Sequence, residues 1–247
     1  MPSINPATTS QQNVLQWMQA IQLELGWASS ASISTNDQTT KQILALMNAS
    51  GDELSRRHQW TWLNRTASIT TVAAQTLYDL PTGYQRQVSD TSFNQTQKWP
   101  MRGPLSSPEW SWLQAGYGAT PPYYRYRLTA GQLEIYPAPT DSLTTLAFEY
   151  VSNFWVLGYT GAVNSVDKLK ITADTDIGVF DNRLFIASTK LKFFETKGFE
   201  NTKLKRDFDE MLELAKANDR GARTYDLLNQ ATSPLAGPWN IPESGWT

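Results

Sequence analysis

Residues 182–218 read NRLFIASTKLKFFETKGFENTKLKRDFDEMLELAKAN, and this stretch contains two helical patterns separated by one glycine. Apolar side chains in the second pattern recur at the 3.6-residue spacing of a single helix face: Leu204, Phe208, Met211, Leu212 and Ala215. The first pattern predicts a buried stripe of similar width: Leu184, Ala187, Ser188, Leu191 and Phe194. Asp181 is a predicted N-cap, and Gly198 a predicted helix end. Each of these two helices buries only one face, so both need partners.

The partners are predicted close to the N-terminus. Residues 11–25 carry Val14, Met18, Ile21 and Leu25 at helical spacing, and a second helix runs from an N-cap at residues 35–37 to about His58. Ser50-Gly51 in the middle of this second helix predicts a kink or a break, because glycine weakens a helix interior. Two helix pairs at opposite ends of the chain can cover each other in a four-helix bundle.

Short alternating runs, rich in Thr, Val and Tyr, fill the region between the helix pairs. Residues 129–131 (Thr-Ala-Gly) separate two such runs and predict a β-hairpin. The predicted fold class is therefore α+β: a helix bundle formed by the N- and C-terminal helices, an inserted antiparallel β domain and an extended C-terminal arm. The predicted domains are residues 1–63 with 166–223 for the bundle, 64–165 for the β insert and 224–247 for the arm.

Composition excludes several classes of function. The chain of 247 residues has no cysteine, one histidine and a net charge of −2, which excludes disulfides and thiolate chemistry and argues against general nucleic-acid affinity. The first twelve residues lack the charged and apolar parts of a secretory leader. No apolar run approaches the roughly 18 residues that span a bilayer, so we expect no membrane partner.

Candidate chemical groups have simpler structural explanations. His58 lies at a helix C-terminus, where the helix dipole favours it, and Asp174-Thr175-Asp176 lacks the further oxygen ligands of a calcium loop. Glu109, Glu134 and Glu149 lie in the aromatic middle region, where a carboxylate pair could hydrolyse a glycoside. We rank that hydrolase reading last. The sequence predicts no enzyme, no catalytic residues, no cofactor and no metal.

The segment from residue 99 to residue 126 is unusually rich in aromatic rings and prolines. Such rings serve as subunit contacts, as sugar-stacking platforms, or, with Arg102, Arg125 and Arg127 nearby, as stacking sites for single-stranded nucleic acid. Positive and negative charges balance in this region, which disfavours nucleic acid. We rank subunit contact first and sugar binding second. The rings expected to bind a partner are Trp99, Trp110, Trp112, Tyr123 and Tyr124.

Three runs resemble parts of a known family. Residues 77–84, LYDLPTGY, resemble the Y-x-L-P-x-D-F turn of phage head-to-tail adaptors, and residues 131–139, GQLEIYPAP, resemble their G-x-L-x-L-x-P-x-P strand. Residues 146–151, LAFEYV, fit the strand that follows. The order of parts over residues 14–220 is similar to the gatekeeper-like adaptors of short-tailed phages, the tail tubular protein A group. One departure is Gly83-Tyr84, where acidic and aromatic residues are usual.

The resemblance implies a structural virion protein without catalytic residues. Its members form a ring, expected to be a dodecamer, that connects the portal protein to the tail nozzle and lines the channel through which DNA passes without sequence-specific binding. The expected location is the tail or neck of the virion, and the host cytoplasm during assembly. The alternative function is a carbohydrate-binding tail module.

The last segment, residues 224–247, has no periodicity and contains three prolines and two tryptophans. We expect Trp239 and Trp246 to bind a partner, the portal, when this arm docks. The alternative is that the arm packs on its own subunit.

Overall fold

The computed structural model describes residues 12–116, 123–158 and 166–220. The helices are α1 (Val14–Glu24), α2 (Gln38–Arg57), the short 3-10 helix η1 (Thr61–Leu63), α3 (Ser107–Gln114), α4 (Asn182–Lys197) and α5 (Thr202–Arg220). The strands are β1 (Asn64–Thr70), β2 (Leu77–Asp79), β3 (Tyr84–Gln87), β4 (Phe93–Asn94), β5 (Trp99–Pro100), β6 (Arg125–Thr129), β7 (Gln132–Tyr136), β8 (Thr145–Ser152), β9 (Val156–Gly158), β10 (Val166–Lys168) and β11 (Ile177–Gly178). This mixture of helices and antiparallel strands confirms the predicted α+β class.

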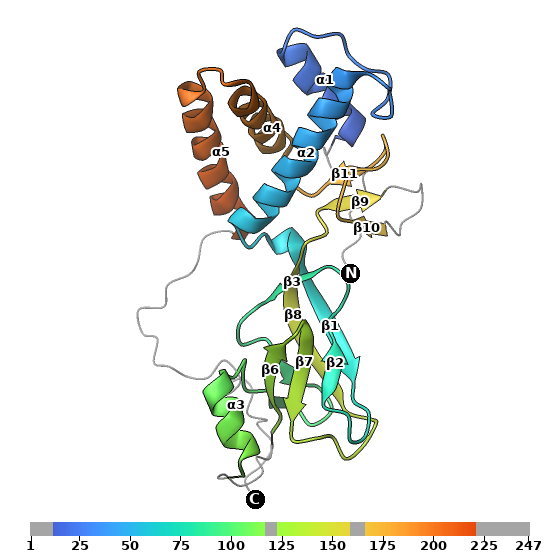
Figure 1. Ribbon diagram of the computed structural model, residues 1–247, viewed down its shortest axis with the longest axis vertical. Coiled ribbons are helices and arrows are strands. Elements are labelled where there is room, and N and C mark those ends of the chain that lie inside the picture. Colours follow the sequence, from blue (N-terminus) through green and yellow to red (C-terminus); the bar gives the residue numbers. More distant parts are fainter. Residues whose placement is uncertain (1–11, 117–122, 159–165, 221–247) are drawn as a thin grey trace, which may run out of the picture.

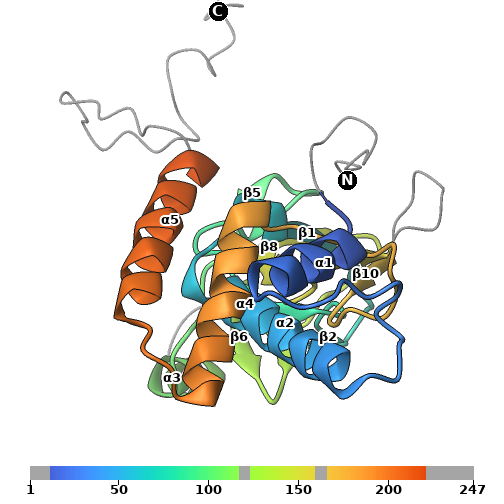
Figure 2. The ribbon, with the colours of Figure 1, turned by 90° about the horizontal axis from the view of Figure 1, so that it is seen from above.

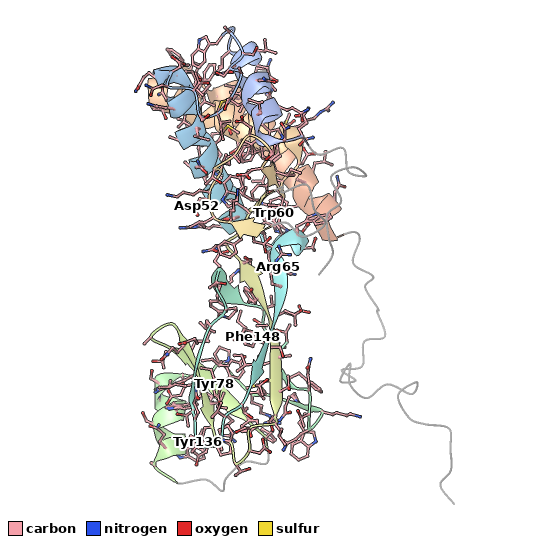
Figure 3. The ribbon with its side chains drawn as sticks, turned by 90° about the vertical axis from the view of Figure 1, so that its right-hand side faces the viewer. Asp52, Trp60, Arg65, Tyr78, Tyr136 and Phe148 are labelled. Carbon is pink, nitrogen blue, oxygen red and sulfur yellow. The ribbon has the colours of Figure 1, made fainter. Side chains whose placement is uncertain are left out.

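The described elements form two ends of an elongated molecule (Figure 1). The helical end holds α1, α2, α4 and α5 with strands β9 to β11, and the strand end holds β1 to β8 with α3. Two separate hydrophobic clusters correspond to these ends. Trp60 and Arg65 lie near the junction between them, whereas Tyr78 and Tyr136 lie well inside the strand end (Figure 3).

Helix α4 lies in the middle of the helical end and packs against α1, α2 and α5. Seen from above, α5 stands beside α4 on the side away from α1 (Figure 2). Trp17 of α1 stacks on Phe185 of α4 with ring centroids 4.3 Å apart, and both side chains are fully buried. Lys192 of α4 also pairs with Glu53 of α2 at the edge of this core. The first and last helices therefore share one hydrophobic cluster.

The capping residues predicted from the sequence are confirmed at three helix ends. The Asp37 side chain accepts a hydrogen bond from the N–H of Thr40 and so caps α2. The Asp181 side chain accepts hydrogen bonds from the N–H groups of Arg183 and Leu184 at the start of α4. Gly198 ends α4 with φ +70°, a left-handed conformation that glycine adopts without strain.

The break predicted at Ser50-Gly51 was wrong. Helix α2 runs without interruption through both residues, and both are buried. A Cβ atom on Gly51 would lie 2.2 Å from Cζ2 of Trp155, so glycine is present because the indole of Trp155 occupies the space of a side chain. A Cβ atom on Gly178 would likewise lie 2.3 Å from Cη2 of Trp17.

The strand end is built from two antiparallel sheets that enclose the second cluster. One sheet has the order β1-β8-β4-β5, with β3 also paired to β8, and the other has the order β2-β7-β6. The predicted hairpin is confirmed, because β6 and β7 pair through Thr129 and Gln132 around Ala130 and Gly131, which both have positive φ. Tyr126, Ile135, Leu146 and Phe148 fill the space between the sheets.

Other local predictions need correction. The alternating pattern does not continue as one strand after β3, because the chain turns at residues 89–90 before β4 begins. Helix α3 was not predicted, and β10 joins a small sheet of order β10-β9-β11 that the sequence pattern did not indicate. Of the two adjacent rings near the end of α4, Phe193 is buried and Phe194 is only partly buried. Trp155, Val156 and Leu157 lie in the core of the helical end, although the sequence pattern grouped them with the β insert.

Candidate interaction surfaces

Helix α3 positions two of the predicted contact rings, Trp110 and Trp112. Its N-terminus is a capping box in which the Glu109 carboxylate accepts hydrogen bonds from the N–H and hydroxyl of Ser106, at 2.8 and 2.7 Å. These two hydrogen bonds to the charged form hold the pKa of Glu109 below its ordinary value. Glu109 is thus a helix cap, and a lowered pKa is the opposite of what a general acid needs.

Trp110 was expected to bind a partner, but its side chain is only 2% exposed. Its ring meets Tyr136 edge-on, with centroids 6.4 Å apart, and the guanidinium of Arg127 lies 4.7 Å from its centroid. Arg127 in turn pairs with Glu134, with 2.6 Å between Nε and Oε2. Trp110 therefore anchors α3 to the sheet, because α3 buries only this ring and Leu113.

The remaining predicted rings differ in their accessibility. Trp112 is 51% exposed and Trp99 is 45% exposed, so both offer large apolar surfaces to a partner. Tyr123 is half-buried, and the guanidinium of Arg102 lies 4.6 Å from its ring centroid. Tyr124 packs partly against the cluster of the strand end, and this burial raises the pKa of its phenol. Trp99 and Trp112 are thus the rings best placed for contact.

Trp239 and Trp246 lie outside the described residues, as does the whole arm of residues 224–247.

Sequence reasoning missed an apolar groove at the junction, which we call the junction groove. It has a volume of about 420 Å³. It is lined by residues at or near η1, the start of α4 and the last turns of α5: Trp60, Trp62, Val179, Phe180, Asp181, Arg183, Met211, Leu214, Ala215, Asn218 and Asp219. The sequence signal for it was Met211, which the helical period placed on the apolar face of α5 and whose side chain is 39% exposed.

Asp219 fixes one end of the junction groove. Its carboxylate accepts hydrogen bonds from the N–H of Thr61, at 3.0 Å, and from the Thr61 hydroxyl, at 2.7 Å. His58 Nε2 lies 3.5 Å from the same carboxylate, and the His58 ring meets Trp60 edge-on. The only histidine in the sequence therefore connects the end of α5 to the end of α2. It lies at the C-terminus of α2 and has a structural role there.

The other candidate chemical groups also have structural roles. Burial alone would raise the pKa of Asp176, but Lys168 and the N–H groups of Thr172 and Ala173 donate hydrogen bonds to its carboxylate and lower the pKa overall. Asp174 accepts a hydrogen bond from the N–H of Ile33, at 2.8 Å. In the parts of the chain that the structure describes, no group of three or more His, Asp or Glu side chains could hold a metal ion.

Glu149, the third carboxylate considered for glycoside hydrolysis, is an exposed residue of β8. Glu109 and Glu134 are engaged with Ser106 and Arg127 as described above, so these carboxylates have individual structural partners rather than a shared pocket. Within the described ranges, no helix is both long enough and apolar enough to cross a membrane.

Comparison with known proteins shows the family to which this chain belongs. No curated protein matches the chain. The family model described as SU10 adaptor protein matches residues 9–174, about two thirds of the chain, and this range includes α1, α2 and β1 to β10. The match confirms the resemblance to phage adaptors that the sequence runs indicated. The chain belongs to the SU10 adaptor protein family.

Proposed function

We propose that this chain is a head-to-tail adaptor of a short-tailed phage, a structural virion protein that forms a ring between portal protein and tail nozzle and lines the DNA channel. Membership of the SU10 adaptor family carries this proposal. The elongated form supports it, because a subunit with two ends can contact one component at each end (Figure 1). We propose twelve subunits, located in the neck of the virion and assembled in the host cytoplasm.

We also propose a division into domains. The helices α1, α2, α4 and α5 form one bundle around the first hydrophobic cluster, and the inserted β domain forms around the second. The burial of Trp155 in the helical cluster favours a second boundary near residue 153 rather than residue 165. Residues 224–247 form the arm.

Ring contacts in this proposal come from exposed aromatic side chains. Trp99 and Trp112 contact neighbouring subunits, with Tyr123 and Tyr124 contributing their accessible edges, and Trp239 and Trp246 of the arm contact the portal. Burying one large apolar side chain contributes about 1.5–3 kcal/mol, which is small for one contact but is repeated around a ring. Each such interface is heterologous, with one face of a subunit meeting a different face of the next.

DNA passage needs a channel wall that does not bind DNA strongly. The whole chain has a net charge of −2, and the strand-rich middle region has equal numbers of acidic and basic residues. A near-neutral wall avoids the counterion-release affinity that clustered lysine and arginine would produce. We propose no catalytic activity and no cofactor, because the candidate carboxylates are helix caps, ion pairs or exposed strand residues.

Assembly can be tested with the purified full chain and the portal protein of the same phage. Mass photometry and negative-stain imaging are expected to show rings bound to the portal. A variant lacking residues 224–247 is expected to keep the far-UV circular dichroism of the wild type and to lose attachment to the portal. Trp112→Ala is the test of subunit contact, and Leu143→Ala, at another highly exposed apolar position, is its control.

Unchanged attachment after deletion of the arm would remove the arm from the proposal. A chain that stays monomeric with portal present, and instead binds glycans through Trp99 and Trp112, would favour the carbohydrate-binding module. Turnover of a polysaccharide that disappears in a Glu134→Gln variant would indicate an enzyme.

A further inference from the structure

The junction groove is an uncovered apolar surface at the end of α5. Three of its lining side chains are exposed: Trp62 by 46%, Met211 by 39% and Leu214 by 64%. Phe180 and Trp60, both buried, also line it. Exposed apolar patches of this kind mark binding surfaces in soluble proteins.

Helix α5 itself explains why the groove is apolar. Its apolar stripe is wider than its contact with α4 requires, because only Phe208 and Leu212 are fully buried. Met211 and Leu214 extend the stripe around the helix to the groove. The uncovered part of such a stripe offers a binding surface for a second partner.

The described residues end beside the groove, and this favours the following part of the same chain as the partner. Helix α5 ends at Arg220, and its last three turns line the junction groove, so the following 27 residues of the chain start at one end of the groove. The groove follows α5 from Met211 to Asp219, about 12 Å at 1.5 Å per residue. An extended segment of about four residues covers this length at roughly 3.3 Å per residue.

The sequence after α5 fits a return along the groove. Gly221 stands where a glycine commonly reverses the chain after a helix. After a reversal over residues 221–224, the next four residues are Tyr225, Asp226, Leu227 and Leu228. In an extended segment Tyr225 and Leu227 point to the same side, which provides two large apolar side chains for one groove.

We propose that residues 225–228 of the same chain occupy the junction groove, antiparallel to α5, with Leu227 opposite Leu214. Charges fit this arrangement, because Arg223 and Asp226 would meet the oppositely charged Asp181 and Arg183 at the groove entrance. The seated segment is the stem of the arm, and the residues beyond it, including Trp239 and Trp246, stay available. Only this last consequence rests on the proposed docking of the arm to the portal.

The absence of cysteine from the chain allows a direct test by disulfide trapping. The full-length variant Leu214→Cys with Leu227→Cys is oxidised mildly, and the rate of disulfide formation is followed on non-reducing gels. The matched control is Glu213→Cys with Leu227→Cys, because Glu213 is one residue away and lies on the other flank of α5. Both pairs close loops of nearly equal length, so an unattached segment would link at equal rates.

The expected result is an intrachain bond that forms about tenfold faster or more with Cys at 214 than at 213, as burial of Leu-sized side chains implies. Adding Trp62→Ser is expected to lower the faster rate to that of the control, because it removes apolar lining without changing the loop. Equal rates at 214 and 213 would overturn the proposal.

A bond between two chains would also overturn it, and would show that the groove holds the segment of a neighbouring subunit. Mixing chains of two lengths distinguishes the two kinds of bond on the gel. The experiment uses the isolated chain without portal, so a failure of portal attachment leaves its result unaffected.

Discussion

Replacing Gly51 with alanine is expected to destabilise the protein, against the usual effect of this change in a helix. Alanine is favoured over glycine in a helix interior by about 1 kcal/mol, and α2 is continuous through Gly51. The new Cβ would, however, lie 2.2 to 2.4 Å from three atoms of the Trp155 ring. The ring would have to move by about 1 Å to restore ordinary van der Waals contact at 3.4 Å or more.

Trp155 has little freedom to make that movement. Its side chain is fully buried, and its ring packs against Phe180 and Phe185 at centroid distances of 6.0 and 5.6 Å. Overpacking of a filled core costs about 1–3 kcal/mol, and the rigid partners here favour the upper part of that range. After the gain in helix propensity is subtracted, we expect a net loss of about 1–2 kcal/mol, or roughly 2–8 °C in Tm.

Thermal and urea unfolding followed by far-UV circular dichroism would measure this loss. Ala49→Gly, at an exposed position of the same helix, is the matched control and is expected to cost about 1 kcal/mol through propensity alone. Combining Gly51→Ala with Trp155→Phe should recover part of the loss, since the smaller ring leaves room for the new methyl group. A Gly51→Ala variant as stable as the wild type, or more stable, would refute the packing argument.

Three further predictions concern other contacts. Trp110→Ala is expected to lower the free energy of unfolding by about 3–5 kcal/mol, whereas Trp112→Ala should change it by less than about 0.5 kcal/mol; urea unfolding measures both. Asp219→Ala should cost about 0.5–1.5 kcal/mol because the exposed N–H and hydroxyl of Thr61 lose their acceptor and turn to water, which the same assay would detect. Folding lowers the pKa of the Asp176 carboxyl below its ordinary value of 3.8. The ionised carboxylate therefore stabilises the fold fully at pH values above 3.8, and this stabilisation is lost as the pH falls through the lower native pKa. The stability difference between wild type and Asp176→Asn should therefore shrink below about pH 4, and a difference that grows there would contradict the assignment.

The predictions from sequence that succeeded depend on short-range chemistry. An N-cap such as Asp181 acts on N–H groups two and three residues away, and a hairpin such as residues 125–136 is set by its two central residues. The amphipathic period of α5 is equally local. These signals therefore gave the α+β class and most of the helix boundaries without any knowledge of tertiary contacts.

The predictions that failed depend on contacts between distant residues. Gly51 was read as a helix breaker, but its function is fixed by Trp155, about a hundred residues later in the chain. Trp110 and Trp112 stand two residues apart with the same composition around them, and only the position of the sheet decides that Trp110 is buried and Trp112 is exposed. Helix α3 was an exception, because the Ser106–Glu109 capping box was a local signal that the aromatic composition obscured.

Strand β8 shows how the fold joins the two ends of the subunit. Leu146, Phe148 and Tyr150 belong to the cluster of the strand end, whereas Val151, in the same strand, belongs to the cluster of the helical end. Strand β1 pairs with β8 along seven consecutive residues, up to Val151. One strand pair thus enters both cores, and this couples the orientation of the two ends. For a protein that contacts a different component at each end, such coupling would keep the two contact surfaces at a fixed spacing, which neither core could do alone.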